Sequence, residues 1–167
     1  MGTFEELLAR GEAALDAGEL EAAEALLRKA AQREPTSARA HNKLGVSLAR
    51  QGRHEEALAC FHRAVELDPL HAPAYCNIGT VYAETGRLEE ALAAYRKAVE
   101  VDPDYWVAHQ NLAALYKRTG RYGEFVRHMK RATRLAARRP AGEGPARRPG
   151  CLVAVVAAAA VLLASLT

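Results

Sequence analysis

The chain has 167 residues, half of them apolar and 26% charged, which fits one soluble globular domain. Aromatic residues make up 6%, alanine is abundant, and no run of alternating β-branched and aromatic residues predicts a strand, so we expect an all-α fold. The three cysteines are odd in number and widely spaced, which argues against a disulfide framework.

The N-terminal stretch is acidic and amphipathic. It has neither a basic region nor a continuous apolar stretch, so no cleavable signal peptide is expected. The formal net charge of +3 hides an asymmetry: eleven Lys and Arg residues lie between 117 and 148, against only Glu124 and Glu143. Such a basic end usually meets an anionic surface.

The sequence repeats with a period of 34 from residue 4 to residue 139. Four columns carry the period: Pro35, Pro69 and Pro103; Gly18, Gly52, Gly86 and Gly120; Ala23, Ala57 and Ala91; and Ala30, Ala64, Ala98 and Ala132. The repeats divide residues 4–139 into units 4–37, 38–71, 72–105 and 106–139.

The third unit predicts two helices joined by a turn. Apolar residues recur at spacings of three and four on both sides of Gly86, the pattern of helices that bury one face. Gly86 suits a helix end in the left-handed conformation, and Pro103 stops the second helix because it lacks an N–H group.

These columns resemble the tetratricopeptide repeat family. The opening of the third unit matches at Tyr75, Ile78, Gly79 and Tyr82, and its later columns match at Ala91, Tyr95, Ala98 and Pro103. The outer units depart more, as when Ala113 stands where the family has a glycine. The resemblance implies a right-handed α-solenoid of about four helix-turn-helix units. Its concave groove, lined by the first helix of each unit, suits a peptide or a partner helix.

Groove positions carried over from the family give the predicted partner-binding residues. They are Arg39, Asn42, Lys43, Val46, Arg50, Asn77, Thr80, Glu84, Gln110 and Asn111. Asn77 and Asn111 lie one repeat apart and form a predicted short ladder of amides. An amide both donates and accepts hydrogen bonds, which suits holding a peptide backbone. A structural role between helices is the alternative for these two asparagines.

The composition changes after Arg139. Three prolines and three glycines among residues 140–150 predict a flexible linker. Residues 151–166 then carry no charge and form a predicted C-terminal transmembrane helix, although 16 residues are short for a span. The alternative is a tail that docks on protein.

Basic residues before the uncharged segment are predicted to face anionic lipid. They are Arg127, Arg131, Arg134, Arg138, Arg147 and Arg148, the first four spaced to share one helix face. Arginines beside the span also predict that the repeats face the cytosol. Nucleic acid is the rival partner, but no recognised motif or interleaved row of aromatic residues supports it.

No pattern in the sequence predicts catalysis, a metal site or a cofactor. There is no C-x-x-C, H-E-x-x-H or phosphate-binding glycine loop, and His41 and His109 occupy a packing column of the repeat. The leading hypothesis is a membrane-tethered adaptor that binds a protein partner in the groove. The alternative is a soluble assembly or co-chaperone-like factor whose apolar tail docks on a partner protein.

Overall fold

The computed structural model describes residues 2–138, and within this range every regular element is an α-helix. The eight helices are α1 (Phe4–Ala17), α2 (Leu20–Arg33), α3 (Ala38–Arg50), α4 (His54–Leu67), α5 (Ala72–Glu84), α6 (Leu88–Val101), α7 (Trp106–Arg118) and α8 (Tyr122–Ala137). The odd-numbered helices, which we call the first helices, begin one repeat apart. The predicted all-α class is confirmed for the described residues.

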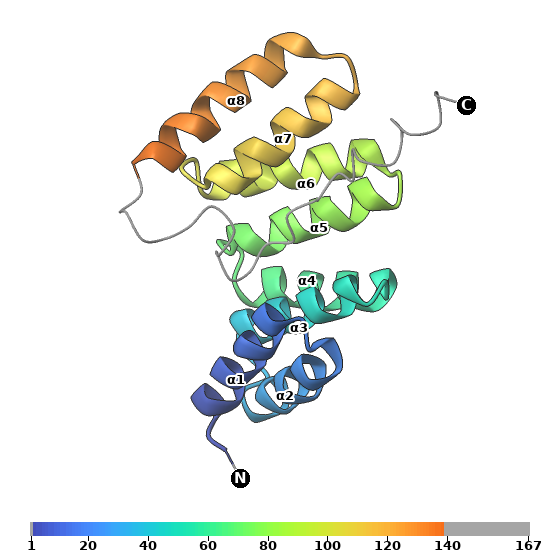
Figure 1. The fold of residues 1–167 in the computed structure, drawn as a ribbon, viewed down its shortest axis with the longest axis vertical. Coiled ribbons are helices and arrows are strands. Elements are labelled where there is room, and N and C mark those ends of the chain that lie inside the picture. The colour runs from blue at the N-terminus through green and yellow to red at the C-terminus, as the bar shows by residue number, and fades with distance from the viewer. Residues whose placement is uncertain (1, 139–167) are drawn as a thin grey trace, which may run out of the picture.

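The helices form four pairs that stack along one direction, from α1 and α2 at one end to α7 and α8 at the other (Figure 1). Each helix packs mainly on the partner in its own pair and otherwise on a neighbouring pair. First helices also contact one another, as α5 does with α3 and α7. Because every pair touches only its neighbours, the architecture is an α-solenoid.

Glycine ends the first helix of each pair, as the sequence predicts. Gly86 has φ +81° and no atom within 4 Å of the place where a Cβ would sit. Glycine is therefore needed at position 86 for its backbone conformation and not for space, since residues with an L side chain rarely adopt positive φ. Gly18, Gly52 and Gly120 share this conformation.

Gly79 has a different role, which is close packing inside the third pair. A Cβ on Gly79 would lie 2.6 Å from Cδ1 of Tyr95 in α6. Tyr95 is 2% exposed, and the small Ala91 and Ala98 of the same helix are fully buried. Small residues at these positions therefore let the two helix backbones approach while an aromatic ring fills the space between them.

Three predicted elements lie partly or wholly outside the described residues: the end of the fourth unit at 139, the linker 140–150 and the apolar segment 151–166. Among residues 2–138, no helix combines the length and the apolar character that crossing a bilayer requires.

Candidate partner-binding surface

All ten predicted partner-binding residues lie in first helices, namely α3, α5 and α7. Together with Glu12 of α1, Cys76 of α5 and Val107 of α7 they form the surface that we call the inner face. Arg39, Arg50, Glu84 and Gln110 are exposed, whereas the other six predicted residues are buried. Their role in binding a partner stays a prediction.

Amide side chains connect successive first helices across the inner face. Asn77 Nδ2 donates to Asn42 Oδ1 at 2.9 Å, and Asn111 Nδ2 lies 3.3 Å from the Sγ atom of Cys76. Both contacts join residues 35 apart, one more than the repeat. The alternative expected for Asn77 and Asn111 was a structural role between helices. That role is present, because their amides connect neighbouring helix pairs.

Glu12 neutralises the cations at the α1 end of the inner face. Its carboxylate lies 2.8 Å from Nη2 of Arg39 and 3.1 Å from Nζ of Lys43. Burial lowers the pKa of Lys43, while the charge of Glu12 opposes this shift. Sequence reasoning missed Glu12, although it stands one repeat before Val46 and so occupies the same register.

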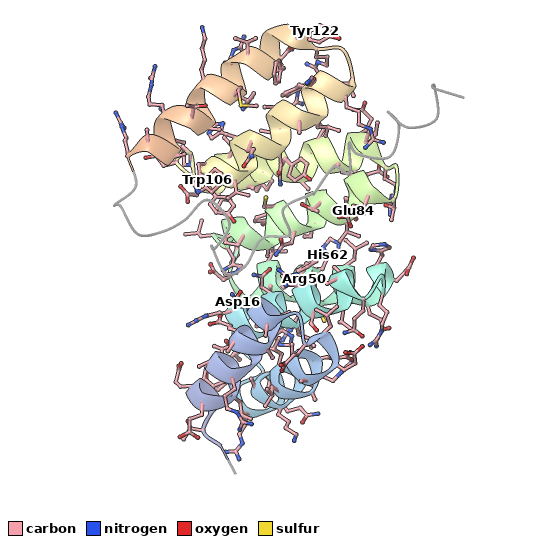
Figure 2. All side chains as sticks on the ribbon, viewed as in Figure 1. Asp16, Arg50, His62, Glu84, Trp106 and Tyr122 are labelled. Carbon is pink, nitrogen blue, oxygen red and sulfur yellow. The ribbon has the colours of Figure 1, made fainter. Side chains whose placement is uncertain are left out.

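The ends of the first helices carry charges of alternating sign. Asp16, Arg50 and Glu84 follow one another along the stack in Figure 2, and Arg118 continues the column. Arg50 Nη1 donates to the carbonyl of Leu15 at 2.7 Å, at the C-terminal end of the preceding first helix. Such a contact satisfies an orphan carbonyl and complements the negative end of the helix dipole.

Between these charged positions, the centre of the inner face is uncharged. No Asp, Glu, Lys or Arg occurs from Ala72 to Ala83 in α5, and Cys76, Asn77 and Thr80 are fully buried. The Thr80 hydroxyl donates to the carbonyl of Cys76 at 3.1 Å and accepts from the Tyr95 hydroxyl at 3.2 Å. Amide, hydroxyl and small apolar groups therefore dominate this region, and their burial is compatible with their polarity because they are hydrogen-bonded within the chain.

The predicted membrane-facing arginines that lie in the described residues are all on α8 or at its end. Arg127, Arg134 and Arg138 are exposed, whereas Arg131 pairs with Asp104 at 2.6 Å. Arg147 and Arg148 lie outside the described residues. The arginine face of α8 thus offers three exposed positions for an anionic surface, and its contact with lipid stays a prediction.

The packing role expected of two histidines is confirmed by equivalent contacts. His41 Nε2 lies 3.0 Å from the carbonyl of Pro35, and His109 Nε2 lies 3.0 Å from that of Pro103, so each ring donates to the preceding loop. His109 Nδ1 also lies 3.0 Å from Nδ1 of His128 in α8. Residues 2–138 contain no cluster of three or more metal-ligating side chains.

The fold and the inner face define a class of protein: an array of repeated helix pairs in which the first helices form one continuous surface. Three family models described as tetratricopeptide repeat match residues 4–47, 36–104 and 82–142, and together they extend over most of the chain. The chain belongs to the tetratricopeptide repeat family.

Solved structures share the architecture. The chain is similar to a crystal structure of MamA, with a TM-score of 0.69 and 29% identity over 81% of this chain and 79% of that one. MamA 41-end from Desulfovibrio magneticus RS-1 has a TM-score of 0.67 and 25% identity, covering 81% and 76%. The structure of Pseudomonas aeruginosa pilF shares the fold, with a TM-score of 0.73 and 24% identity, covering 82% and 63%.

The search of curated proteins gave no match. Membership of the repeat family and the likeness to these structures indicate a scaffold for protein–protein interaction. Proteins of this family are generally adaptors rather than enzymes.

Proposed function

We propose that this protein is a membrane-tethered adaptor that holds a peptide or a helix of a partner protein against its inner face. The observation that carries the proposal is the set of exposed side chains on the first helices, with Arg50 and Glu84 one repeat apart and Gln110 on α7. An exposed amide such as that of Gln110 can bind main-chain amides and carbonyls, and the exposed charges of opposite sign on Arg50 and Glu84 can set the direction of the bound segment.

The tether is the uncharged segment 151–166, preceded by Arg147 and Arg148. Its eight valine and leucine residues each favour insertion by about 0.3–0.6 kcal/mol, and no charged residue opposes them. The arginine face of α8 ends where the linker begins, so it can lie against lipid head groups once the segment inserts. The repeats then face the cytosol.

Membrane tethering is tested by fractionation with an alkaline carbonate wash. The full chain is compared with a chain that ends at Gly150, which keeps all eight helices. Retention of the full chain and release of the shorter one support the tether. Release of both overturns it, and favours the second candidate, a soluble assembly factor whose tail docks on a partner protein.

Groove binding is tested by placing a photo-crosslinking amino acid at Glu84, which is exposed at the inner face. The matched control places the same group at His62, which is exposed on α4, the second helix of its pair (Figure 2). The proposal expects a defined adduct from position 84 and none from position 62. Equal labelling from both positions would show that the inner face has no special role.

A further inference from the structure

A cavity of about 280 Å³ lies between α8, α7 and the loop that joins α6 to α7. We call it the histidine cavity, and its lining residues are Val99, Pro103, His109, Arg127, His128 and Arg131. Its volume is just below the range of about 300–1,000 Å³ that is usual for small-molecule sites, so it suits a small ligand. None of these residues belongs to the inner face.

The polar lining of the histidine cavity is particular to the fourth pair. Arg127 stands where the other three pairs have alanine, and His128 stands where they have leucine, cysteine or alanine. The corresponding hollow in the first pair has Leu7 and Leu26 among its lining residues, three repeats before His109 and His128. Apolar or small residues therefore satisfy the helix-pair fold at these positions. Packing alone does not explain why the fourth pair carries a guanidinium and an imidazole there.

The two histidines are ordered by one chain of hydrogen bonds. Nε2 of His109 lies 3.0 Å from the carbonyl of Pro103, which can only accept, so this nitrogen carries the proton. Nδ1 of His109 therefore accepts, and Nδ1 of His128, 3.0 Å away, donates to it. The hydrogen bonds of residues 2–138 leave Nε2 of His128 unused. His128 consequently takes up a further proton at Nε2, and the N–H so formed can bind an acceptor that enters the cavity.

Positive charge dominates the surroundings of His128. Burial lowers its pKa most, followed by the positive charges of His109, Arg127 and Arg96, while Glu124 opposes this shift. The ring of His128 is therefore neutral at pH 7 without an anion. A doubly charged anion in the cavity would reverse the local field, because an opposite charge within about 4–6 Å favours the protonated form.

The two arginines of the cavity differ in their partners. Arg127 is exposed and has no ion pair among residues 2–138. Arg131 pairs with Asp104 of the loop at 2.6 Å, which orients its guanidinium and leaves other N–H groups free to donate. Glu124, the acidic residue of α8, is already paired with Arg121 at 2.8 Å. The cavity thus offers an unpaired cation, and no carboxylate belongs to its lining.

We propose that the histidine cavity binds one phosphate group, held by Arg127, Arg131 and protonated His128. A planar guanidinium can donate to two phosphate oxygens at once, and Nε2 of His128 adds a charge-assisted hydrogen bond. Val99 and Pro103 form an apolar wall, which suits the phosphate of a lipid headgroup better than free phosphate. The lipid source rests on the proposed function, in which α8 lies against lipid, whereas the phosphate chemistry does not.

The titration of His128 tests the site directly. The full chain, in a neutral maltoside detergent and with its six histidines labelled with ¹³C at Cε1, is titrated by NMR in inorganic phosphate and in chloride of equal ionic strength. The His128 signal is the one that His128→Leu removes. We expect phosphate to raise the pKa of His128 by about 1 unit. His62, which is exposed on α4, should titrate identically in both salts. An unchanged His128, or an equal effect at His62, overturns the proposal.

A matched pair of variants separates a built site from general attraction. Arg127→Ala restores the residue that the other three pairs carry, so the fold tolerates it. Lys130→Ala removes the same charge from an exposed position of α8 that does not line the cavity. Arg127→Ala should weaken phosphate binding at least about tenfold, and Lys130→Ala less than about twofold. Equal weakening would show that only the overall charge of α8 matters, and would overturn the proposal.

A second probe distinguishes the sources of the phosphate group. Butyl phosphate is a soluble monoester whose short chain can contact Val99 and Pro103, so it should bind at least about threefold tighter than inorganic phosphate. Equal affinities support the site with free phosphate as its ligand and overturn the lipid source. The carbonate wash judges the tether separately. An anchored chain without a phosphate effect on His128 overturns this site alone, whereas a released chain with the effect supports the site and overturns the tether.

Discussion

The substitution Gly79→Ala tests how the third pair is packed. A Cβ at this position would meet Cδ1 and Cε1 of Tyr95 at 2.6 and 2.7 Å, where ordinary contact begins at 3.4 Å. The ring, which is 2% exposed, must therefore move by about 0.8 Å in a filled core. Overpacking of this kind costs about 1–3 kcal/mol, while the better helix propensity of alanine returns about 1 kcal/mol.

We expect a net loss of about 1 kcal/mol in the free energy of unfolding. The assay is urea denaturation followed by circular dichroism. Gly123→Ala is the matched control, because Gly123 lies in α8 and no atom comes within 4 Å of the place where its Cβ would sit. It should therefore gain up to about 1 kcal/mol from helix propensity alone.

The fourth pair already carries alanine at the position equivalent to Gly79, together with a different side chain opposite it. Ala113 and Met129 stand one repeat after Gly79 and Tyr95, so this chain already combines alanine with a flexible side chain in that register. In a Tyr95→Met background, Gly79→Ala should consequently be neutral or stabilising, since a thioether chain can move aside. An equal cost of Gly79→Ala in both backgrounds would refute the packing argument.

Three other predictions concern charges. Glu12→Gln leaves Lys43 buried without a counter-charge and should cost about 2 kcal/mol in urea denaturation, whereas adding Lys43→Met should restore most of it. Burial raises the pKa of Glu24, but hydrogen bonds from Gln51 and two arginines outweigh it and lower the pKa to about 2. Its contribution is therefore present above about pH 4.5 and lost as the pH falls toward 2, and Glu24→Gln should flatten acid unfolding in that range. Burial, followed by nearby positive charge, lowers the pKa of His128, so protonation favours the unfolded chain. Stability should fall as the pH drops through 6.5, and His128→Phe should reduce that slope in thermal melts.

Much of the fold could be predicted from the repeat alone. The glycine column marks the turn inside each pair, and Pro103 follows the end of α6 at Val101. These positions are local in cause, because positive φ and the missing N–H of proline act within one or two residues. For that reason the departure of Ala113 from the family pattern did not prevent α7 from forming.

The sequence predicted which positions of the first helices belong to the inner face, but not which contacts these residues make. Sequence reasoning placed Asn77 in the right helix, but its bond to Asn42 joins residues 35 apart and depends on how two first helices are offset. Glu12 was missed because a carboxylate in an atypical first unit has no local signature.

The sequence by itself determined that the chain is an all-α array of pairs, because its regular period repeats the same helix ends and the same small residues at each pair. Only the tertiary structure decided which groove residues are buried and which charges cancel. Lys43 and Arg39 are both cationic in the sequence, yet they share the carboxylate of Glu12, and one is buried while the other is exposed. Burial and pairing depend on the packing of helices that are distant in sequence, and that packing fixes the chemistry of the inner face.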